Sequence, residues 1–290
     1  MKIINFGSLN IDHVYQVDHI VLPGETIAGS SHSLHAGGKG ANQSVAIARA
    51  GGKVSHAGKI GSDGLWMIDR MKADGIDVSH VMIGDSATGH AIIQVDGKGQ
   101  NAIVVFGGTN RMISGDEIDD VLTKAMPDDS ILLQNEINNI PYIMEQAAKR
   151  KLPISFNPAP MGPEVFDYPL GAVSTFFVNN SEGEALTGEK DPEAILSHMQ
   201  TRYPDALVIL TLGSKGSLYA KGSHRETILA PSVNAVDTTG AGDTFIGYFC
   251  ACMQRGMALK DSLVAATKAA SICVTRKGAT TSIPVIKEVL

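Results

Sequence analysis

The feature that most constrains this fold is the alternation of short apolar runs with longer amphipathic ones. The short runs predict strands at Ile3–Phe6, Val54–Ile60, Ser130–Leu133, Ile154–Phe156, Thr175–Val178 and Leu207–Thr211. Helical periodicity predicts helices at Lys39–Ala50, Leu65–Asp74 and Ser114–Met126, and from about Ala241 and Asp261. Strands that alternate with helices form parallel sheets with both faces covered. We therefore expect an α/β fold with a mainly parallel sheet between two helical layers.

Two segments, about residues 11–35 and 88–106, lack helical periodicity and read as extended chain. The second has two β runs around Asp96–Gln100, which is typical of a hairpin. Antiparallel strands can leave one face exposed, so these segments can form a small separate sheet that acts as a lid or an oligomer contact. An edge extension of the main sheet fits the pattern equally well. Without repeats or linkers, residues 1–290 are expected to form one domain with this lid inserted.

Composition narrows the class of protein. The net charge is -6 with both signs scattered, which argues against a nucleic-acid-binding surface. The three cysteines are Cys250, Cys252 and Cys273, and they are expected to be free and buried in a reducing compartment. The sequence has no signal-peptide pattern and no apolar run of membrane-spanning length. The nine histidines show no zinc-binding spacing. A cytoplasmic enzyme or binding protein is expected, without a membrane partner.

Two polar clusters precede the middle of the chain. Asn10 and Asp12 follow the first strand, where open α/β sheets bind ligands, and both can face one side of an extended chain. An amide and a carboxylate suit paired hydroxyls, but an Asx turn is an alternative. Gly37–Gln43 opens the next helix with glycines that allow close approach of a ligand. This cluster matches neither a P-loop nor a dinucleotide fingerprint, and a flexible turn explains it equally well.

The stretch Asp237–Phe245 places glycines and an aspartate before an apolar helix. The amides of Gly240, Ala241 and Gly242 can bind an anion at the helix N-terminus. Asp243 in the first turn either stabilises the helix by its charge or takes a proton from an attacking hydroxyl. Phosphoryl transfer needs both a donor cradle and such an aspartate.

Two further spacings are weaker. Asn179 and Glu182 can hold the water shell of Mg²⁺, although a helix cap is the more common use of this spacing. Thr211–Gly216 offers small residues and amides suited to a nucleotide, and a β-turn explains it as well.

In this order along the chain, these motifs resemble the ribokinase family of ATP-dependent carbohydrate kinases, over essentially the whole sequence. The resemblance implies a doubly wound domain with a β lid. It implies that Asp243 is the general base and that Gly240, Ala241 and Gly242 form the anion hole. The sugar would be held by Asn10, Asp12, Gly38, Lys39, Asn42 and Glu136. The ATP site would include Asn179, Thr211, Gly213, Ser214 and Gly216, and Glu182 would bind Mg²⁺ through water.

The resemblance also implies a monovalent cation, K⁺, beside the anion hole. Its ligands, mostly backbone carbonyls, match Asp237, Thr239, Cys273, Arg276, Gly278 and Ser282. The expected reaction is transfer of the γ-phosphoryl of MgATP to a primary hydroxyl of a small sugar, with D-ribose favoured over another ketose, a nucleoside or a sugar acid. The rival classes are a sugar-binding protein without catalysis and an NAD oxidoreductase. The two helix-free segments predict a homodimer joined through the lid.

Overall fold

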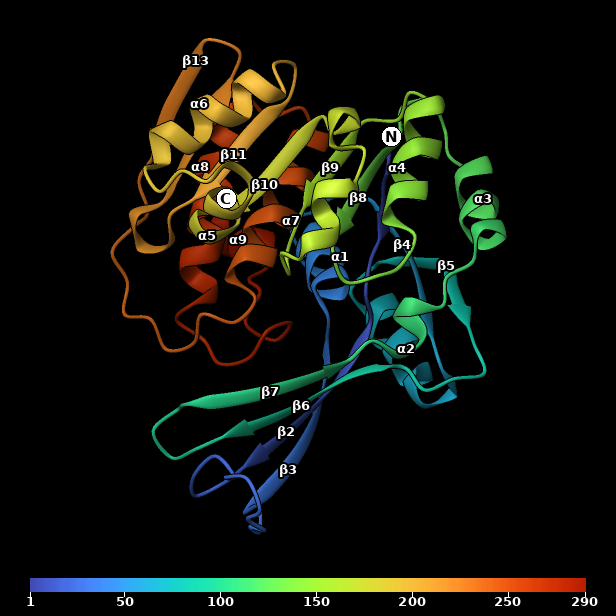
Figure 1. Ribbon diagram of the computed structural model, residues 1–290, viewed down its shortest axis with the longest axis vertical. Helices are drawn as coiled ribbons and strands as arrows, with labels where there is room; N and C mark the ends of the chain where they lie inside the picture. The colour runs from blue at the N-terminus through green and yellow to red at the C-terminus, as the bar shows by residue number, and fades with distance from the viewer.

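The computed structural model describes residues 1–290 and contains two sheets, one large and one small (Figure 1). The large sheet has the strand order β13-β12-β11-β10-β9-β8-β1-β4-β5. Neighbours from β11 to β5 are parallel, whereas β12 is antiparallel to β11 and the edge strand β13 is antiparallel to β12. The mainly parallel fold is therefore confirmed. The strands of the large sheet are β1 Ile3–Phe6, β4 Val54–Ile60, β5 Asp77–Ile83, β8 Ser130–Gln134, β9 Ile154–Asn157, β10 Thr175–Asn179, β11 Leu207–Thr211, β12 Ser217–Lys221 and β13 His224–Ile228.

Helices cover both faces of this sheet and enclose two apolar cores. One core is shared by α1 Lys39–Arg49, α2 Leu65–Ala73, α7 Ala241–Gln254 and α8 Leu259–Cys273. The other is shared by α3 Gly115–Thr123, α4 Ile140–Lys149, α5 Asn180–Thr187 and α6 Pro192–Arg202. A short α9, Ile286–Val289, ends the fold. Along β11, Leu207 and Ile209 enter the first core while Val208 and Leu210 enter the second, as the twofold period of a strand requires. Both cores follow from strands that are apolar on both faces.

The small sheet projects away from the helical body (Figure 1). Its order is β3-β2-β6-β7, with β2 Asn10–Gln16, β3 Ser31–Gly37, β6 Gly89–Val95 and β7 Asn101–Phe106. The hairpin expected around residues 96–100 joins β6 to β7. The sequence suggested antiparallel strands for this sheet, but its central pair, β2–β6, is parallel. These two strands follow β1 and β5, which point the same way in the large sheet, so both leave its carboxyl edge in the same direction.

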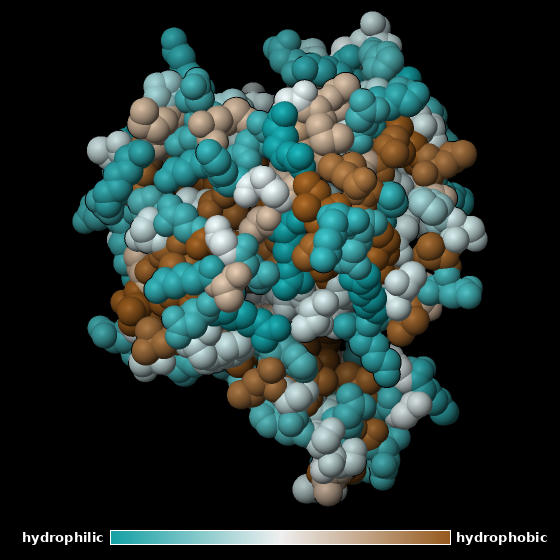
Figure 2. All heavy atoms as spheres, turned by 180° about the vertical axis from the view of Figure 1, so that it is seen from behind, coloured by the Kyte–Doolittle hydropathy of each residue, from teal (hydrophilic) through white to brown (hydrophobic).

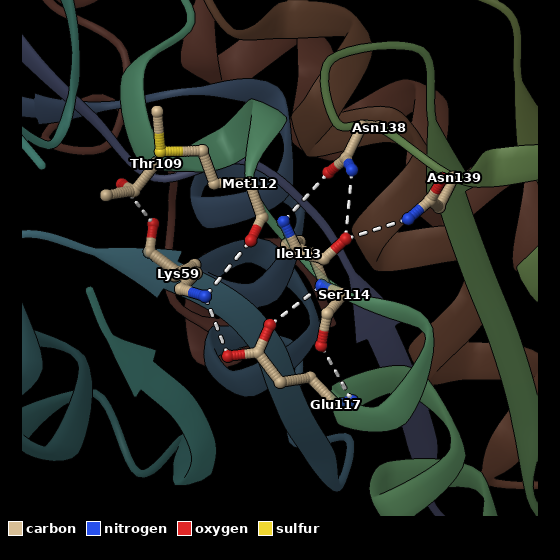
Figure 3. A network of polar contacts seen from close by, with 8 residues as sticks. All are labelled: Lys59, Thr109, Met112, Ile113, Ser114, Glu117, Asn138 and Asn139. Atoms are coloured by element: carbon tan, nitrogen blue, oxygen red, sulfur yellow. Dashed lines mark hydrogen bonds and ion pairs between the residues drawn. The ribbon is translucent and has the colours of Figure 1, made fainter. Parts of the chain in front are cut away.

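A polar network fastens the return from the small sheet, residues 109–114, to the body (Figure 3). The Lys59 ammonium donates to the Met112 carbonyl and pairs with Glu117 at 2.7 Å, while the Thr109 hydroxyl donates to the Lys59 carbonyl. Ser114 and Glu117 form a capping box at the start of α3. On the other side, Asn138 and Asn139 donate to the Ile113 carbonyl. This clamp fixes Asn110, a residue that reaches the candidate site.

Two further features concern the cysteines and the helices. Cys250, Cys252 and Cys273 are free and buried. None of the helices combines the length and the apolar character that crossing a membrane requires.

Candidate active site

The predicted ligand-binding residues gather where the strand order reverses. From β1 the chain first adds β4 and β5 on one side and later adds β8 and β9 on the other, so the carboxyl ends of β1 and β8 flank the switch point where α/β sheets bind ligands. The Ser8 hydroxyl, after β1, donates to Oε2 of Glu136, after β8. The Lys39 backbone N–H donates to the same oxygen at 2.8 Å. A Cβ on Gly40 would lie only 2.4 Å from the Ser8 nitrogen. Helix α1 can therefore start this close to the end of β1 only because residue 40 is a glycine.

Asn10 and Asp12 lie at the base of the small sheet, on the same face of β2. Asn110 Nδ2 donates to Asn10 Oδ1 at 2.7 Å and to the Leu9 carbonyl at 3.1 Å. The Asp12 carboxylate lies across the strand β3 backbone, where a Cβ on Gly37 would approach its Oδ2 to 2.0 Å. Burial, with a smaller contribution from Glu136, raises the pKa of Asp12 to about 7. Asp12 thus lacks a partner that favours its ionised form.

Asp243 occupies the first turn of α7, with only 8% of its surface exposed. Its Oδ2 accepts from Asn42 Nδ2 and its Oδ1 accepts from Gln43 Nε2, both at 2.9 Å. Burial raises the pKa of Asp243, and Lys39 and the two amides oppose this shift. Gly240 caps the helix with a φ of 75°, and a Cβ on Gly242 would meet no atom within 4 Å. The surface at Gly242 is therefore open beside a buried carboxylate, while the Ala241 N–H donates to the Thr238 carbonyl at 3.3 Å.

Lys39 supplies the positive charge at the centre of the site. Burial lowers the pKa of its ammonium, but attraction to Asp243, Glu136 and Glu182 outweighs this effect, so the pKa is raised. The side chain therefore remains a cation among three carboxylates, which suits binding of an anionic group.

A cleft of about 520 Å³ opens beside the carboxyl ends of β10 and β11. Three of the residues predicted for ATP, Asn179, Thr211 and Gly213, line it, together with Asn180, Ser181, Lys190, Pro192, Leu212 and Lys215. Ser214 and Gly216 do not line it, and a Cβ on Gly216 would lie 2.0 Å from the Ile228 carbonyl, so this glycine packs against β13. Lys215 lies within the stretch Thr211–Gly216 but was given no role, and Lys190 was not predicted because an isolated exposed lysine carries no motif.

Asn179 and Glu182 form the helix cap that was the alternative to a magnesium role. The Asn179 side chain accepts from the Glu182 N–H, and the Glu182 carboxylate accepts from the Asn179 N–H at 3.0 Å and from its Nδ2 at 2.8 Å. Burial raises the pKa of Glu182, although hydrogen bonding to Asn179 and the charge of Lys39 oppose the shift. The carboxylate is held at the edge of the site, and its remaining lone pairs can accept from a water shell.

Of the six residues predicted for a monovalent cation, Cys273 ends α8 and the other five lie in two loops that meet beside α7. Asp237 joins the loops, since its Oδ1 accepts from the Thr239 N–H and its Oδ2 from the Gly278 N–H, both at 2.9 Å. Partial burial opposes ionisation, but these bonds hold the pKa of Asp237 below its usual value. Cys273 Sγ lies 3.0 Å from Ser282 Oγ and 3.9 Å from the Thr239 carbonyl. The Arg276 side chain turns away to Glu288, which leaves only its backbone for the loop.

Comparison with known proteins gives a consistent result. The family described as pfkB family carbohydrate kinase matches residues 1–286. A ribokinase of Haemophilus influenzae is 34% identical over 293 residues, which cover 98% of this chain and 95% of the relative. The crystal structure of ribokinase from Thermotoga maritima has a TM-score of 0.88 at 34% identity and covers 100% of this chain and 98% of its own. The structure of Arabidopsis thaliana ribokinase complexed with ribose and ATP has a TM-score of 0.87 at 29% identity, covering 99% and 97%.

Proposed function

The chain belongs to the pfkB family of carbohydrate kinases, and on that premise we propose that it transfers the γ-phosphoryl group of ATP to a primary hydroxyl of D-ribose. The observation that carries this proposal is the buried carboxylate of Asp243 at the N-terminus of α7, close enough to Lys39 to interact with its charge. The relatives from H. influenzae, T. maritima and A. thaliana are ribokinases, and the last was solved with ribose and ATP. These likenesses favour ribose over other sugars.

In this reaction the site residues divide into three roles. Hydroxyls of the sugar are bound by Asn10, Asp12, Gly38, Lys39, Asn42 and Glu136. Asp243 takes the proton of the attacking hydroxyl, whose oxygen bonds to the γ-phosphorus as the bond to the β–γ bridging oxygen breaks and ADP leaves. The amides of Gly240, Ala241 and Gly242 stabilise charge on the transferred group, aided by the helix dipole.

ATP and two cations complete the proposal. The nucleotide occupies the cleft near Asn179, Thr211, Gly213, Ser214 and Gly216. Glu182 would hold Mg²⁺ through water, and a cation bound there would supply positive charge beside the phosphates. Asp237 and Thr239, with the 273–282 loop, hold K⁺ as an activator, which fits an ionised carboxylate bridging two loops that carry backbone carbonyls. These residues brace the turn that presents the Gly240–Gly242 amides.

The direct test is ADP release with MgATP and a panel of ribose, fructose, adenosine and gluconate. Ribose should give the highest kcat/KM, and ³¹P NMR should place the phosphate on its primary hydroxyl. Asp243→Asn should lower kcat by at least about 10²-fold, because positioned acid–base groups contribute about 10²–10⁴-fold. Turnover of the variant within about tenfold of wild type would contradict the assignment of the base.

Other outcomes select the alternatives. Higher kcat/KM with another ketose, a nucleoside or a sugar acid would keep the chemistry and change the substrate. Calorimetric binding of ribose without any ADP release would support a sugar-binding protein. We also place the enzyme in a reducing, cytoplasmic compartment, with the three free cysteines as support.

The small sheet is proposed as a lid over the sugar and as the contact of a homodimer. Its edge strand β7 exposes four successive apolar side chains, Ile103, Val104, Val105 and Phe106, between 52% and 70%. Apolar atoms are visible on the projecting small sheet in Figure 2. An exposed apolar edge strand favours pairing with another chain. Light scattering should give twice the chain mass at micromolar concentration, and a monomer there would count against the dimer.

A further inference from the structure

A chain of uncharged polar side chains runs beneath the site from Asp243 into the large sheet. Its members are all completely buried: Gln43, Gln134, Asn5, Ser44 and His56. Burying polar groups is unfavourable unless each finds a partner, and apolar side chains would fill this space at lower cost. The proposed reaction uses none of these five residues directly. Their presence in the buried interior between the large sheet and α1 therefore calls for a role.

The contacts link the five residues in series. Gln43 Nε2 donates to Asp243 Oδ1 at 2.9 Å, and Gln43 Oε1 accepts from Gln134 Nε2 at 2.7 Å. Gln134 Nε2 also donates to Asn5 Oδ1 at 2.9 Å, and Asn5 Nδ2 donates to Ser44 Oγ at 2.8 Å. Ser44 Oγ lies 2.9 Å from His56 Nδ1, and His56 Nε2 lies 3.2 Å from the Gly7 carbonyl.

The contact between His56 and the Gly7 carbonyl, at the end of this series, determines which atom donates in each of its hydrogen bonds. A carbonyl only accepts, so His56 carries its proton on Nε2 and its Nδ1 accepts from Ser44. Burial lowers the pKa of His56 to about 4, although the bond to Gly7 opposes the shift, and the ring is therefore neutral at pH 7. Ser44 then accepts from Asn5, Asn5 accepts from Gln134, and Gln134 donates to Gln43. If the Gln43 amide were rotated by 180°, its Nε2 would lie against the Gln134 Nε2, which is also a donor. Its Oε1 would then lie against the Asp243 carboxylate, which is also an acceptor.

The two amides on Asp243 differ in their surroundings. Asn42 is part of the proposed sugar site, and its Oδ1 is buried with no hydrogen-bond partner, so the ligand-free protein leaves this acceptor unused. Gln43 has both ends occupied and lies where α1 and α7 pack so closely that a Cβ on Gly247 would be 2.8 Å from the Gln43 carbonyl. Gln43 therefore has no freedom to leave Asp243 when substrate arrives.

We propose that Gln43 is a positioning residue that locks Oδ1 of Asp243, so that Oδ2, on the Asn42 side, receives the proton of the sugar hydroxyl. Gln134, Asn5, Ser44 and His56 act through Gln43 by fixing the orientation of its amide. This inference rests on the proposed role of Asp243 as the base.

The test compares Gln43→Met, which removes the donor with little change in volume, with Gln200→Met as a matched control. Gln200 is another buried amide, remote from the site, whose Nε2 donates to the Ala206 carbonyl at 2.8 Å. Gln43→Met should lower kcat by tenfold or more with KM for ribose within about threefold, since Gln43 does not face the sugar. Gln200→Met should leave kcat within twofold. In an Asp243→Asn background, Gln43→Met should cause no further loss, because residues that act as a unit are not additive.

An unchanged kcat in Gln43→Met, or a full additional loss in the Asp243→Asn background, would overturn the inference. If Asp243→Asn itself stays active, the proposed function fails instead, so the two failures are distinguishable. If Gln43→Met does not fold, Gln43→Glu decides through the pH profile of kcat. The charged groups that face Asp243 are Lys39, Glu136 and Glu182, and an added carboxylate at Gln43 should move the acid limb upward by at least half a pH unit. An acid limb at the wild-type pH would overturn the proposal.

Discussion

Replacing Asp12 by Asn should stabilise the ligand-free protein while weakening its binding of ribose. Asp12 lies at the base of the small sheet, and burial with the nearby Glu136 raises its pKa from 3.8 to about 7. Folding therefore disfavours the carboxylate. Asparagine keeps the shape of the side chain and removes the charge, so it relieves this penalty. The same change removes a charged acceptor for a sugar hydroxyl, a hydrogen bond worth about 1.5–3 kcal/mol.

The sign and size follow from proton linkage. Below about pH 4 the carboxyl is protonated in both the folded and the unfolded protein, so it contributes no penalty. Between about pH 4 and 7 only the unfolded chain is ionised, and the free energy of unfolding falls as pH rises. The penalty is complete above about pH 7. At about 1.4 kcal/mol per pKa unit, the shift of about three units sets an upper limit of about 4 kcal/mol, of which about 1.6 is present at pH 5.

Thermal unfolding without ligands measures this prediction. Asp12→Asn should raise the Tm at pH 8 by several degrees, and the gain should be less than half as large at pH 5. Asp18→Asn, which removes a carboxylate from an exposed position, is the control and should change Tm little at either pH. An equal gain for Asp12→Asn at both pH values would refute the reasoning, because a penalty from ionisation must depend on pH. Calorimetry should show at least tenfold weaker ribose binding.

Three other changes test parts of the structure that place the site. Gly40→Ala would bring a Cβ to 2.4–2.5 Å from the backbone of Gly7 and Ser8, so it should lower the free energy of unfolding by about 1–3 kcal/mol in urea titrations. The control is Gly171→Ala, whose Cβ would meet no atom within 4 Å. Equal losses in the two variants would count against close packing of α1 on β1. Glu117→Gln should destabilise by about 1 kcal/mol because its ion pair with Lys59 is half-buried, whereas Asp120→Asn breaks only the exposed pair with Lys124. The pKa of Glu117 is lowered from 4.5, against the effect of its burial, by bonds to Lys59 and Ser114, so the effect of Glu117→Gln should shrink as pH falls below about 4.5 and through the lowered pKa of the folded protein; an effect that does not shrink with falling pH would exclude the ion pair as its cause. Asp237→Asn should raise the KCl concentration for half-maximal ADP release, and an unchanged KCl dependence would reject the proposed role of Asp237 in K⁺ binding.

The sequence predicted the large sheet well because each of its inner strands is apolar on both faces. Ile3–Phe6 and Leu207–Thr211 were placed with the bounds that the structure shows. The outer strands β5, β12 and β13 were not predicted, because polar residues interrupt each of them and weaken that signal. The parallel pairing of β2 with β6 was missed for another reason. Pairing between distant strands depends on how each leaves the large sheet, and no local pattern records that direction.

The candidate site was predictable where backbone chemistry leaves a mark in the sequence. Glycines at Gly37–Gly40 and Gly240–Gly242, each just before or at a helix start, pointed to the two helix N-termini that meet in the structure. Asn110 left no such mark. It reaches Asn10 only because the clamp around Lys59 and Ile113 returns the chain to the switch point. A contact between residues 100 positions apart depends on the completed fold, so no local sequence pattern predicts it.

The buried chain behind Asp243 did leave a signal, of a different kind. Asn5 and His56 are polar residues within strands that were predicted from the sequence, and Gln134 directly follows a third predicted strand and ends β8 in the structure. Such residues conflict with the local pattern, and in natural proteins these conflicts concentrate at functional sites. Each strand alone gives only one weak exception to its apolar run. Because β1 lies between β4 and β8 in the sheet, the three exceptions fall on adjacent strands and become one connected network. Only when the strand order is known do these three polar residues indicate a network that positions Asp243, the proposed proton acceptor.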